Sequence, residues 1–358
     1  MATSAPSGRL YSLVADLGVV IDGYTWEQRS REFGSAFTRT TTVIHLSGGG
    51  QLGVGEDVTP FEPAQHSFAD AAGELSLGGR FTLASFAAHL DGLSLYDPRG
   101  LPPGFPRTFR RWALESAALD LALRQAGISL AEALNREPRP VRFVNSLSLG
   151  ERGAAAVHSR LELYPKLRFK LDPAADWSDE LMRDLAATDA VDIIDLKGQY
   201  PPQAPIALAP DAGLYERIAA AFPQAWLEDP GLTPETRQAL EPHFGRVSWD
   251  LPIVTVADVD SLPIRPRAIN IKPARHGTLR RLLEVLEESA RRGIPTYGGG
   301  MGELGPGREQ NQYLAAIFSP DAPNDVAPVA YNDAELAPGL PDSPLRVRPA
   351  AAGFGVSM

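Results

Sequence analysis

The sequence contains no cysteine, no apolar run long enough to span a membrane and no surplus of basic charge. The absence of cysteine excludes disulfides, thiolate metal sites and a cysteine nucleophile. Because neither a membrane span nor a signal-peptide pattern is found, we expect a cytoplasmic protein without a membrane partner. The net charge of −10 disfavours nucleic acid as a partner, since phosphate binding requires a basic surface.

Lysine is also scarce: of 34 basic residues only four are lysine, namely Lys166, Lys170, Lys197 and Lys272. A coding preference for arginine explains the scarcity itself. The lysines that remain are informative, because a buried lysine can be tuned into a base whereas an arginine stays charged. Each of them is therefore a candidate for chemistry.

The chain is long enough for two domains or for one barrel with additions, and 44% hydrophobic with 22% charged residues is typical of a globular protein. Residues 1–110 mix strand and helix patterns. Within them, residues 39–46 are rich in Thr, Val and Ile, glycines follow at 48–50, and residues 52–56 continue the apolar pattern. This arrangement predicts a β-hairpin in an α+β unit.

From about residue 111, short apolar runs alternate with helical patterns. Eight such runs indicate a barrel of parallel strands in which helices lie between most of the strands. The predicted strands are 141–144, 167–170, 191–195, 225–228, 247–250, 268–272, 294–297 and 326–329.

Five successive predicted strands end in a charged residue, in the order Lys170, Asp195, Glu228, Asp250 and Lys272. The spacings are 25, 33, 22 and 22 residues, each about one strand and one helix. Because barrel active sites lie at the C-terminal ends of the strands, we expect the five side chains to meet at one mouth. One charge at a strand end is usually a structural ion pair, whereas an ordered set of five predicts an active site.

Three converging carboxylates repel each other unless a cation lies between them, and carboxylate oxygens suit Mg²⁺. We therefore predict one divalent cation per subunit, Mg²⁺ or Mn²⁺, held by Asp195, Glu228 and Asp250. Such a cation can neutralise the charge that develops when a bound carboxylate loses its α-proton. Lys170 and Lys272 flank the carboxylates, and we expect them to remove and return that proton or to stabilise a leaving group.

Two more cations follow from strand alternation, because residues two apart in a strand share a face. Arg168 is predicted to lie on the same side as Lys170 and to lower the pKa of that lysine. By the same alternation, Lys197 is predicted to lie beside Asp195.

With these residues in place, the sequence resembles the enolase superfamily, in particular the branch that contains muconate cycloisomerase, o-succinylbenzoate synthase and dipeptide epimerases. The resemblance rests on the five strand-end residues and on residues 53–56 and 115–120, and it covers most of the chain. It implies an α/β fold, a modified TIM barrel of the (β/α)7β type over residues 111–334, with an N-terminal α+β capping domain of residues 1–110 joined by residues 335–358. It also implies a small-molecule carboxylate substrate, Mg²⁺-assisted enolate chemistry and a homo-oligomer.

The sequence departs from the family pattern near the predicted site. Arg168 stands where the family has the first lysine of Lys-x-Lys, and Lys197 stands where it has the amide of Asp-x-Asn. Leu251 replaces the acidic residue that usually follows the third metal ligand. We interpret Lys197 as a contact for an extra anionic group of the substrate, and the departures together indicate a divergent subgroup.

Residues 298–308, after the seventh predicted strand, are rich in glycine. The amides of Gly299 and Gly300 are expected to approach an anionic substrate, and Glu303 is expected to support a neighbouring group. A plain flexible loop is the alternative interpretation.

Loops of the capping domain close over the mouth of the barrel in this family. The candidates here are residues 22–26, which include Tyr24 and Trp26, and the segment around Phe61. Their aromatic side chains are expected to exclude water and contact the substrate, or else to anchor the loop by packing.

The predicted function is Mg²⁺-dependent abstraction of the proton α to a carboxylate through an enolate. The outcome is cycloisomerisation, racemisation or epimerisation, or syn-elimination, so the protein is expected to be an isomerase or a lyase. An acid-sugar dehydratase is an alternative, disfavoured because the seventh strand carries no His. An inactive barrel that acts as a binding protein is a second alternative, supported by Arg168 and Lys197. A zinc hydrolase would require His at strand ends, and none of the predicted strands ends in His.

Overall fold

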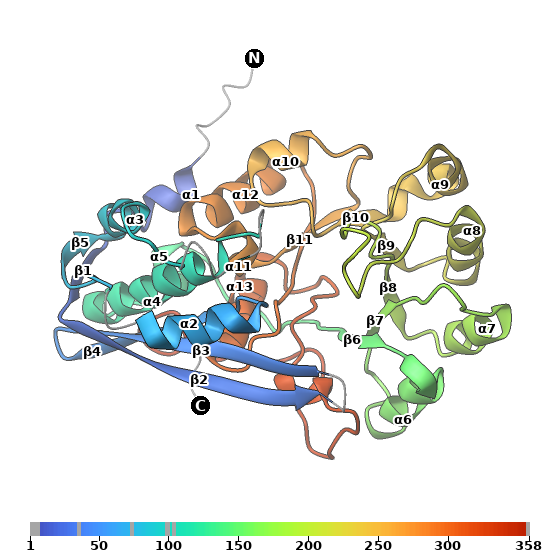
Figure 1. Cartoon of the computed structure of the whole chain (residues 1–358), viewed down its shortest axis with the longest axis horizontal. Coiled ribbons are helices and arrows are strands. Elements are labelled where there is room, and N and C mark those ends of the chain that lie inside the picture. Colours follow the sequence, from blue (N-terminus) through green and yellow to red (C-terminus); the bar gives the residue numbers. More distant parts are fainter. Residues whose placement is uncertain (1–7, 34–36, 72–74, 97–100, 102–104, 356–358) are drawn as a thin grey trace.

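The computed structural model describes residues 8–33, 37–71, 75–96, 101 and 105–355 (Figure 1). An antiparallel sheet near the N-terminus lies beside a curved parallel sheet with surrounding helices, so the α/β fold predicted from the sequence is confirmed. Among the described residues, no helix is long and apolar enough to cross a membrane.

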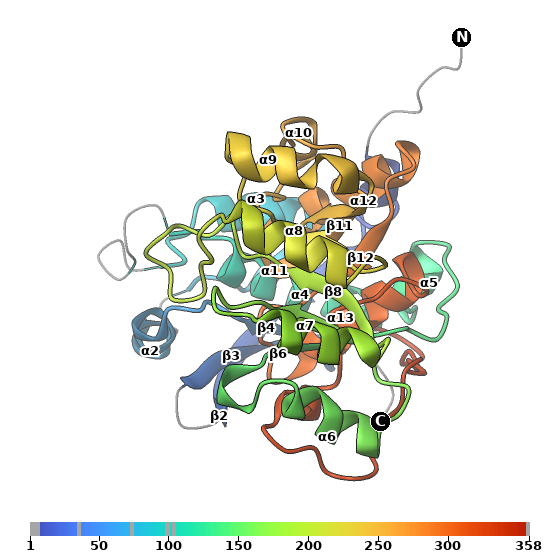
Figure 2. The same cartoon turned by 90° about the vertical axis from the view of Figure 1, so that its right-hand side faces the viewer.

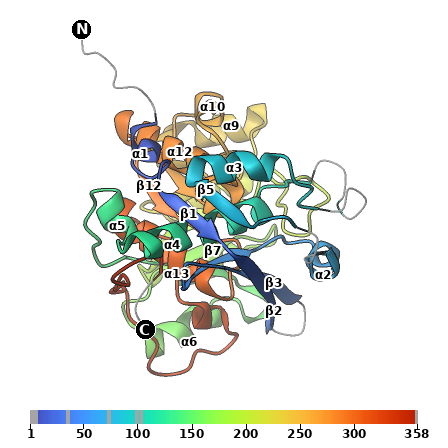
Figure 3. The ribbon, with the colours of Figure 1, turned by 90° about the vertical axis from the view of Figure 1, so that its left-hand side faces the viewer.

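The N-terminal part is built on a three-stranded antiparallel sheet in the order β2-β3-β4. The predicted hairpin is confirmed as β3 and β4, and Gly49 and Gly50 turn it with φ angles of 56° and 74°. A second antiparallel pair joins β1 to β5, beside helices α3 and α4 (Figure 3). The elements are α1 Arg9–Ser12, β1 Gly18–Ile21, β2 Gly23–Phe33, β3 Phe37–Gly48, β4 Gln51–Asp57, α2 Glu62–Ala71, β5 Gly79–Thr82 and α3 Leu83–Asp91.

The long helix α4 (Phe109–Ala126) packs directly on β4. A Cβ atom added to Gly53 would lie 2.3 Å from the carbonyl oxygen of Ala117. A Cβ atom added to Gly55 would lie 2.0 Å from the carbonyl oxygen of Ala113. Glycine at these two positions therefore lets the backbones of the sheet and the helix touch.

Seven parallel strands form the second sheet and follow one another in chain order across it. Their bounds are β6 Asn145–Ser148, β7 Phe169–Asp172, β8 Val191–Asp195, β9 Trp226–Glu228, β10 Val247–Trp249, β11 Ala268–Ile271 and β12 Thr296–Gly298. Helices α7, α8 and α9 cover the outer side of this sheet, which faces the viewer in Figure 2.

The remaining helices connect the strands or pack against them. They are α5 Leu130–Ala133, α6 Ala155–Leu163, α7 Asp179–Ala187, α8 Ala212–Ala221, α9 Pro234–Leu240, α10 Val256–Asp260, α11 Pro273–His276, α12 Leu279–Arg291 and α13 Pro306–Phe318. Short 3₁₀ helices cover Gly150–Arg152, Glu241–Arg246 and Val329–Asn332.

The parallel sheet has seven strands where the sequence predicted eight. Residues 326–329 do not form a strand, because Pro328 interrupts the run and proline cannot donate to a strand ladder. The sheet is closed instead by two residues: Asn324 bridges to Phe143 ahead of β6, and Asp325 bridges to Gly299 after β12. The Asn324 side chain reinforces this closure, since its Oδ1 accepts a hydrogen bond of 2.6 Å from the amide of Gly298.

The first predicted strand is displaced along the chain. Residues 141 and 143 make isolated bridges, and regular pairing with β7 begins only at Asn145, opposite Phe169. Leu345 of the C-terminal segment bridges to Val141 and occupies the backbone groups that a longer strand would have used. The C-terminal segment then packs Phe354 against Trp112 of α4.

Candidate active site

The five charged residues predicted from the sequence come together toward the C-terminal ends of β7 to β11, although β7 does not end at Lys170 as predicted but continues to Asp172. Their side chains are buried, with exposed fractions between 0% and 7%. Strand pairing sets their arrangement, because Asp195 of β8 lies opposite Glu228 of β9, and Glu228 lies opposite Ser248 of β10. Each of the three carboxylates accepts a hydrogen bond from, or pairs with, a cationic side chain.

Lys170 lies at the centre of this cluster. Its Nζ atom is 3.0 Å from Asp195 Oδ2, contacts Glu228, and is 3.6 Å from Asp325 Oδ2 in the segment that closes the sheet. Burial alone would lower the pKa of Lys170, but its three carboxylate neighbours raise this pKa well above the usual range. Lys170 is therefore a cation in this arrangement.

The prediction that Arg168 lies beside Lys170 and lowers its pKa is wrong. Arg168 points away and pairs with Asp192, with Nη2 at 2.6 Å from Asp192 Oδ1. It precedes the first residue of β7, and the pairing of β7 with β8 shifts register between Phe169 and Lys170. The simple two-residue alternation therefore does not extend back to Arg168.

The prediction for Lys197 agrees with the geometry. Its Nζ atom lies 2.5 Å from Asp195 Oδ2 and 3.3 Å from Asp172 Oδ1, which comes from the end of β7. The backbone of Lys197 has a φ of 51°, in the left-handed region, and its amide donates to Asp195 Oδ1 at 3.2 Å. The backbone amide and the ammonium group of Lys197 therefore both contact the carboxylate of Asp195.

Glu228 is held between two strands. The hydroxyl of Tyr297 on β12 donates to Glu228 Oε2 at 2.5 Å, while Lys170 contacts Oε1. Burial raises the pKa of Glu228 well above its usual range, against the opposing charge of Lys170, and the nearby Asp195 and Asp250 carboxylates raise it further. Among Asp195, Glu228 and Asp250, Glu228 is therefore the carboxylate that holds a proton most readily, because the pKa values of the other two are lowered.

Asp250 follows β10 and accepts contacts from two cations. Lys272 Nζ lies 2.8 Å from Asp250 Oδ2, and Arg275 Nη1 lies 2.5 Å from Oδ1. Burial would raise the pKa of Asp250, but these two charges hold it below its usual range. Asp229 positions this segment, because its carboxylate accepts hydrogen bonds of 2.8 Å from the amides of Asp250 and Leu251.

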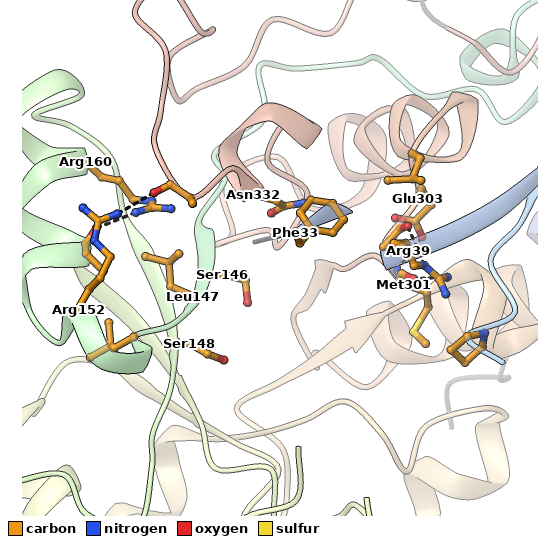
Figure 4. Close-up of a pocket in the computed structure, with 16 residues that line it drawn as sticks. Phe33, Arg39, Ser146, Leu147, Ser148, Arg152, Arg160, Met301, Glu303 and Asn332 are labelled. Carbon is orange, nitrogen blue, oxygen red and sulfur yellow. Dashed lines mark hydrogen bonds between the residues drawn. The ribbon is translucent and has the colours of Figure 1, made fainter. Parts of the chain in front are cut away.

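Two cavities adjoin the cluster. The first, of about 710 Å³, lies between the end of β6, the 301–304 loop and the N-terminal part (Figure 4). The second, of about 750 Å³, includes Asp172 and Lys197 in its wall. Ser148 and Leu149 line both cavities and so separate them.

The glycine-rich loop after β12 serves the protein's own packing. A Cβ atom on Gly299 would lie 2.2 Å from Asn270 Oδ1, and one on Gly300 would lie 2.4 Å from Glu303 Oε2. The amide of Gly299 donates to the carbonyl of Ile271, so it does not face a ligand as the sequence predicted. Glu303 is buried, accepts from the amide of Met301 at 2.7 Å and lines the first cavity.

Tyr24 and Trp26 are not on a loop over the mouth, which corrects the prediction. Both lie within strand β2 and pack against the hydrophobic core, and the Tyr24 hydroxyl accepts from the amide of Leu75 at 3.3 Å. The N-terminal part lines the first cavity instead with Phe33 at the end of β2, Arg39 of β3 and Pro60 after β4. Phe61 packs against Phe105, with ring centroids 6.1 Å apart.

Two family models match the sequence. Residues 137–333 match the model of the DUF8230 C-terminal domain, and residues 12–133 match that of the DUF8230 N-terminal domain, both described as domains of unknown function. The chain belongs to the DUF8230 family. The sequence of this DUF8230 member matches no curated protein.

Solved structures that resemble the DUF8230 chain include enzymes of the enolase superfamily. Muconate cycloisomerase from Pseudomonas fluorescens is 17% identical, with a TM-score of 0.68 over 95% of this chain and 97% of that one. A dipeptide epimerase from Enterococcus faecalis V583 is 14% identical, with a TM-score of 0.68 over 95% and 100%. An unknown enolase-superfamily member from the same organism is 18% identical, with a TM-score of 0.63 over 86% of each chain. The resemblance predicted from the sequence is therefore confirmed at the level of the fold.

Sequence reasoning missed several residues of the DUF8230 site. Asp172 lies two positions after Lys170, so strand alternation could have predicted it on the same face of the sheet. Arg275 lies one helical turn after Lys272, in α11, and Tyr297 lies inside β12. No sequence pattern predicted Asp325, because the two-residue segment that holds it is too short to show the alternation of a strand.

The predicted metal ligands of the DUF8230 chain are close but are engaged by cations. Lys170 contacts both Asp195 and Glu228, while Asp250 faces Lys272 and Arg275. Across the part of the chain that the structure describes, no three acidic or histidine side chains are grouped so that they could hold a metal ion.

Proposed function

We propose that this DUF8230 protein is an enzyme that abstracts the proton α to a carboxylate, by the chemistry of the enolase superfamily. The observation that supports the proposal is that two buried lysines contact three buried carboxylates at the mouth of the sheet: Lys170 contacts Asp195 and Glu228, and Lys272 contacts Asp250. Muconate cycloisomerase and dipeptide epimerase among the similar structures favour an isomerisation or epimerisation. Elimination and acid-sugar dehydration remain the alternatives within the same chemistry.

The two lysines have different surroundings in this proposal. The raised pKa of Lys170 makes it a cation at the outset, suited to donate a proton or to hold a substrate carboxylate. Among the described residues, Asp250 is the one carboxylate that pairs with Lys272, and Arg275 also balances its charge. We assign Lys272 the role of proton acceptor, with Arg275 as the group that holds Asp250 in place. A racemisation would use both lysines in either direction.

Asp195, Glu228 and Asp250 are the residues that would hold a divalent cation. Their chemistry fits, because all three are buried carboxylates, which are hard oxygen donors, from the ends of separate strands. When bound, Mg²⁺ supplies positive charge that stabilises a developing enolate oxygen. Binding requires that the Lys170 ammonium leave the space between Asp195 and Glu228, so metal and lysine compete for these oxygens.

A metal-binding and exchange experiment tests this function. Wild-type protein is mixed with Mg²⁺ and a panel of carboxylic acids in D₂O, and α-deuteration is followed by NMR. We expect incorporation with Mg²⁺ and its loss after EDTA treatment. The proposal fails if calorimetry finds no Mg²⁺ binding at millimolar concentration and no acid in the panel exchanges.

A barrel that binds ligands without catalysis is the second candidate function. The observation that favours it is that each predicted metal ligand already contacts a lysine or an arginine. If the protein binds ligands without catalysis, the acids in the panel should bind with the same affinity whether Mg²⁺ is present or absent, and none should exchange its α-proton.

A further inference from the structure

The first cavity, beside the charged cluster, has a charge distribution that the proposed chemistry does not use. Arg152 and Arg160 lie together at one end, while Arg39, Met301 and Glu303 lie at the other, with Leu147 and Ser146 between (Figure 4). Leucine, phenylalanine, proline and alanine side chains make up much of the wall. The cavity is therefore a largely apolar chamber with two arginines at one end.

The arginine pair at that end bonds to neutral groups. Arg160 is buried and donates to the side-chain oxygen of Asn145 at 3.1 Å and to the carbonyls of Ala156 and Asp333 at 3.0 and 2.7 Å. Arg152 donates to the carbonyl of Ala334 at 2.8 Å and to the hydroxyl of Ser159 at 3.2 Å. Among the described residues, neither guanidinium forms an ion pair with a carboxylate.

Asp333, whose charge also acts on Arg160, forms its ion pair with another residue. The Asp333 carbonyl accepts from Arg160, but its carboxylate pairs with Arg31 of β2 at 2.5 Å. Burial and the neighbouring charge of Arg152 lower the pKa of Arg160, as expected for a cation that lacks a full counter-charge. Since burying an unpaired charge is unfavourable, this end of the cavity is suited to an anion.

The opposite end of the cavity is balanced. Arg39 is buried and donates to the carbonyls of Val58, Met301 and Gly302. Glu303 lies beside it and also faces Arg308, whose Nη2 is 3.3 Å from Glu303 Oε2. An acidic group therefore accompanies the arginines here, so an anion is favoured at the Arg152–Arg160 end alone.

Two residues that line the cavity neighbour the charged cluster, although none of the five charged residues lines it. Ser146, which lines it, is the strand partner of Lys170 in the pairing of β6 with β7. Met301, which also lines it, has its sulfur atom 3.7 Å from Arg275 Nη2. A ligand whose carboxylate sits at the charged cluster can therefore extend into this chamber.

We propose that the chamber holds the far end of a dianionic substrate, whose second carboxylate binds Arg152 and Arg160 while its apolar middle lies along Leu147 and Leu149. The inference rests on the proposed function, because it takes the charged cluster as the place where the first carboxylate reacts. It narrows the substrate to carboxylic acids with an acidic group at each end and an apolar spacer. The terminal nitrogens of both guanidinium groups each donate one hydrogen bond to a neutral group, and each carries a second N–H that remains for a carboxylate oxygen.

Binding of two matched probes tests the inference without catalysis. Adipate and hexanoate have the same chain length, but only adipate has a charge at both ends. By calorimetry, we expect the wild-type protein to bind adipate about 10- to 100-fold more tightly than hexanoate. Arg152→Gln, at an exposed guanidinium, should remove this preference, and Arg160→Lys should reduce it. Arg183→Gln, which removes an exposed arginine on α7 outside both cavities, should keep it.

Equal affinity for the two probes, no binding of either, or an adipate preference that survives Arg152→Gln would each overturn the inference. Failure of the proposed function looks different. If the adipate preference depends on Arg152 while no acid exchanges its α-proton, the chamber is an anion site but the proposed α-proton abstraction is wrong. If monocarboxylic acids exchange as readily as dicarboxylic acids, the reaction stands and the chamber assignment falls.

Discussion

The Lys170 ammonium nitrogen lies 3.0 Å from Asp195 Oδ2, on the face of the sheet where three buried carboxylates meet. The lysine thus contacts two of the three residues that the sequence predicted as metal ligands. Lys170 is both a candidate acid and the counter-charge of two buried carboxylates.

Removal of the Lys170 charge should destabilise the fold. Lys170→Met keeps most of the side-chain volume but leaves Asp195 and Glu228 buried without their shared partner, which is expected to cost about 3 kcal/mol of unfolding free energy. Urea denaturation measures the change, and Mg²⁺ should restore part of it. Lys166→Met, at an exposed lysine, is the control and should change stability little. A Lys170 variant as stable as the control would show that the cluster needs no such counter-charge.

Lys197 and a divalent cation should compete for Asp195. Lys197→Asn removes the ammonium that lies 2.5 Å from Asp195 Oδ2, and asparagine tolerates the left-handed backbone at this position. We expect the variant to bind Mg²⁺ about 10-fold more tightly by titration calorimetry, since one competing charge is gone. Weaker Mg²⁺ binding by Lys197→Asn would instead mean that Lys197 holds Asp195 in its ligating position.

His276 should make stability depend on pH. Burial lowers the pKa of His276 to about 4, and the ring is held neutral with Nδ1 against the Val254 carbonyl. The unfolded chain takes up this proton near pH 6.5, so the folded state should lose stability as the pH falls from about 6.5 to about 4, by about 3 kcal/mol in total. In His276→Asn the unfolding free energy should fall less steeply across this window. Identical slopes for both proteins would contradict the assignment.

The contact between β4 and α4 should tolerate no side chain. Gly55→Ala places a Cβ atom 2.0 Å from the Ala113 carbonyl oxygen, so we expect a loss of about 3 kcal/mol from forced backbone movement. Gly18→Ala is the matched control, because a Cβ atom there would meet nothing within 4 Å. Thermal unfolding of both variants checks the difference, and equal melting temperatures would show that the two backbones can separate at little expense.

The sequence predicted the barrel and its charged strand ends because both depend on a periodic pattern. Lys170, Asp195, Glu228, Asp250 and Lys272 each close an apolar run, and parallel pairing then brings such ends to one edge. The β3–β4 hairpin was predictable for the same reason, since its glycine turn is local.

Features set by non-local geometry were not predictable. A register shift turns Arg168 away from the site, and Tyr24 and Trp26 belong to a strand that pairs with β3 along its whole length. The sheet closes at Asn324 and Asp325, where pairing depends on residues far along the chain. The ion pairs that engage the predicted metal ligands likewise depend on distances that no spacing in the sequence reveals.

The central claim is that Lys170 and Lys272 act at the same α-carbon, with Lys272 as the proton acceptor. The most direct measurement compares α-deuteration of the best exchanging acid in D₂O by the wild type, Lys170→Ala, Lys272→Ala and the control Lys166→Ala, all with Mg²⁺. We predict that loss of Lys272 slows exchange about 1,000-fold, that loss of Lys170 impairs it similarly, and that the control exchanges at the wild-type rate. Exchange at the wild-type rate by the Lys272→Ala protein would contradict the account.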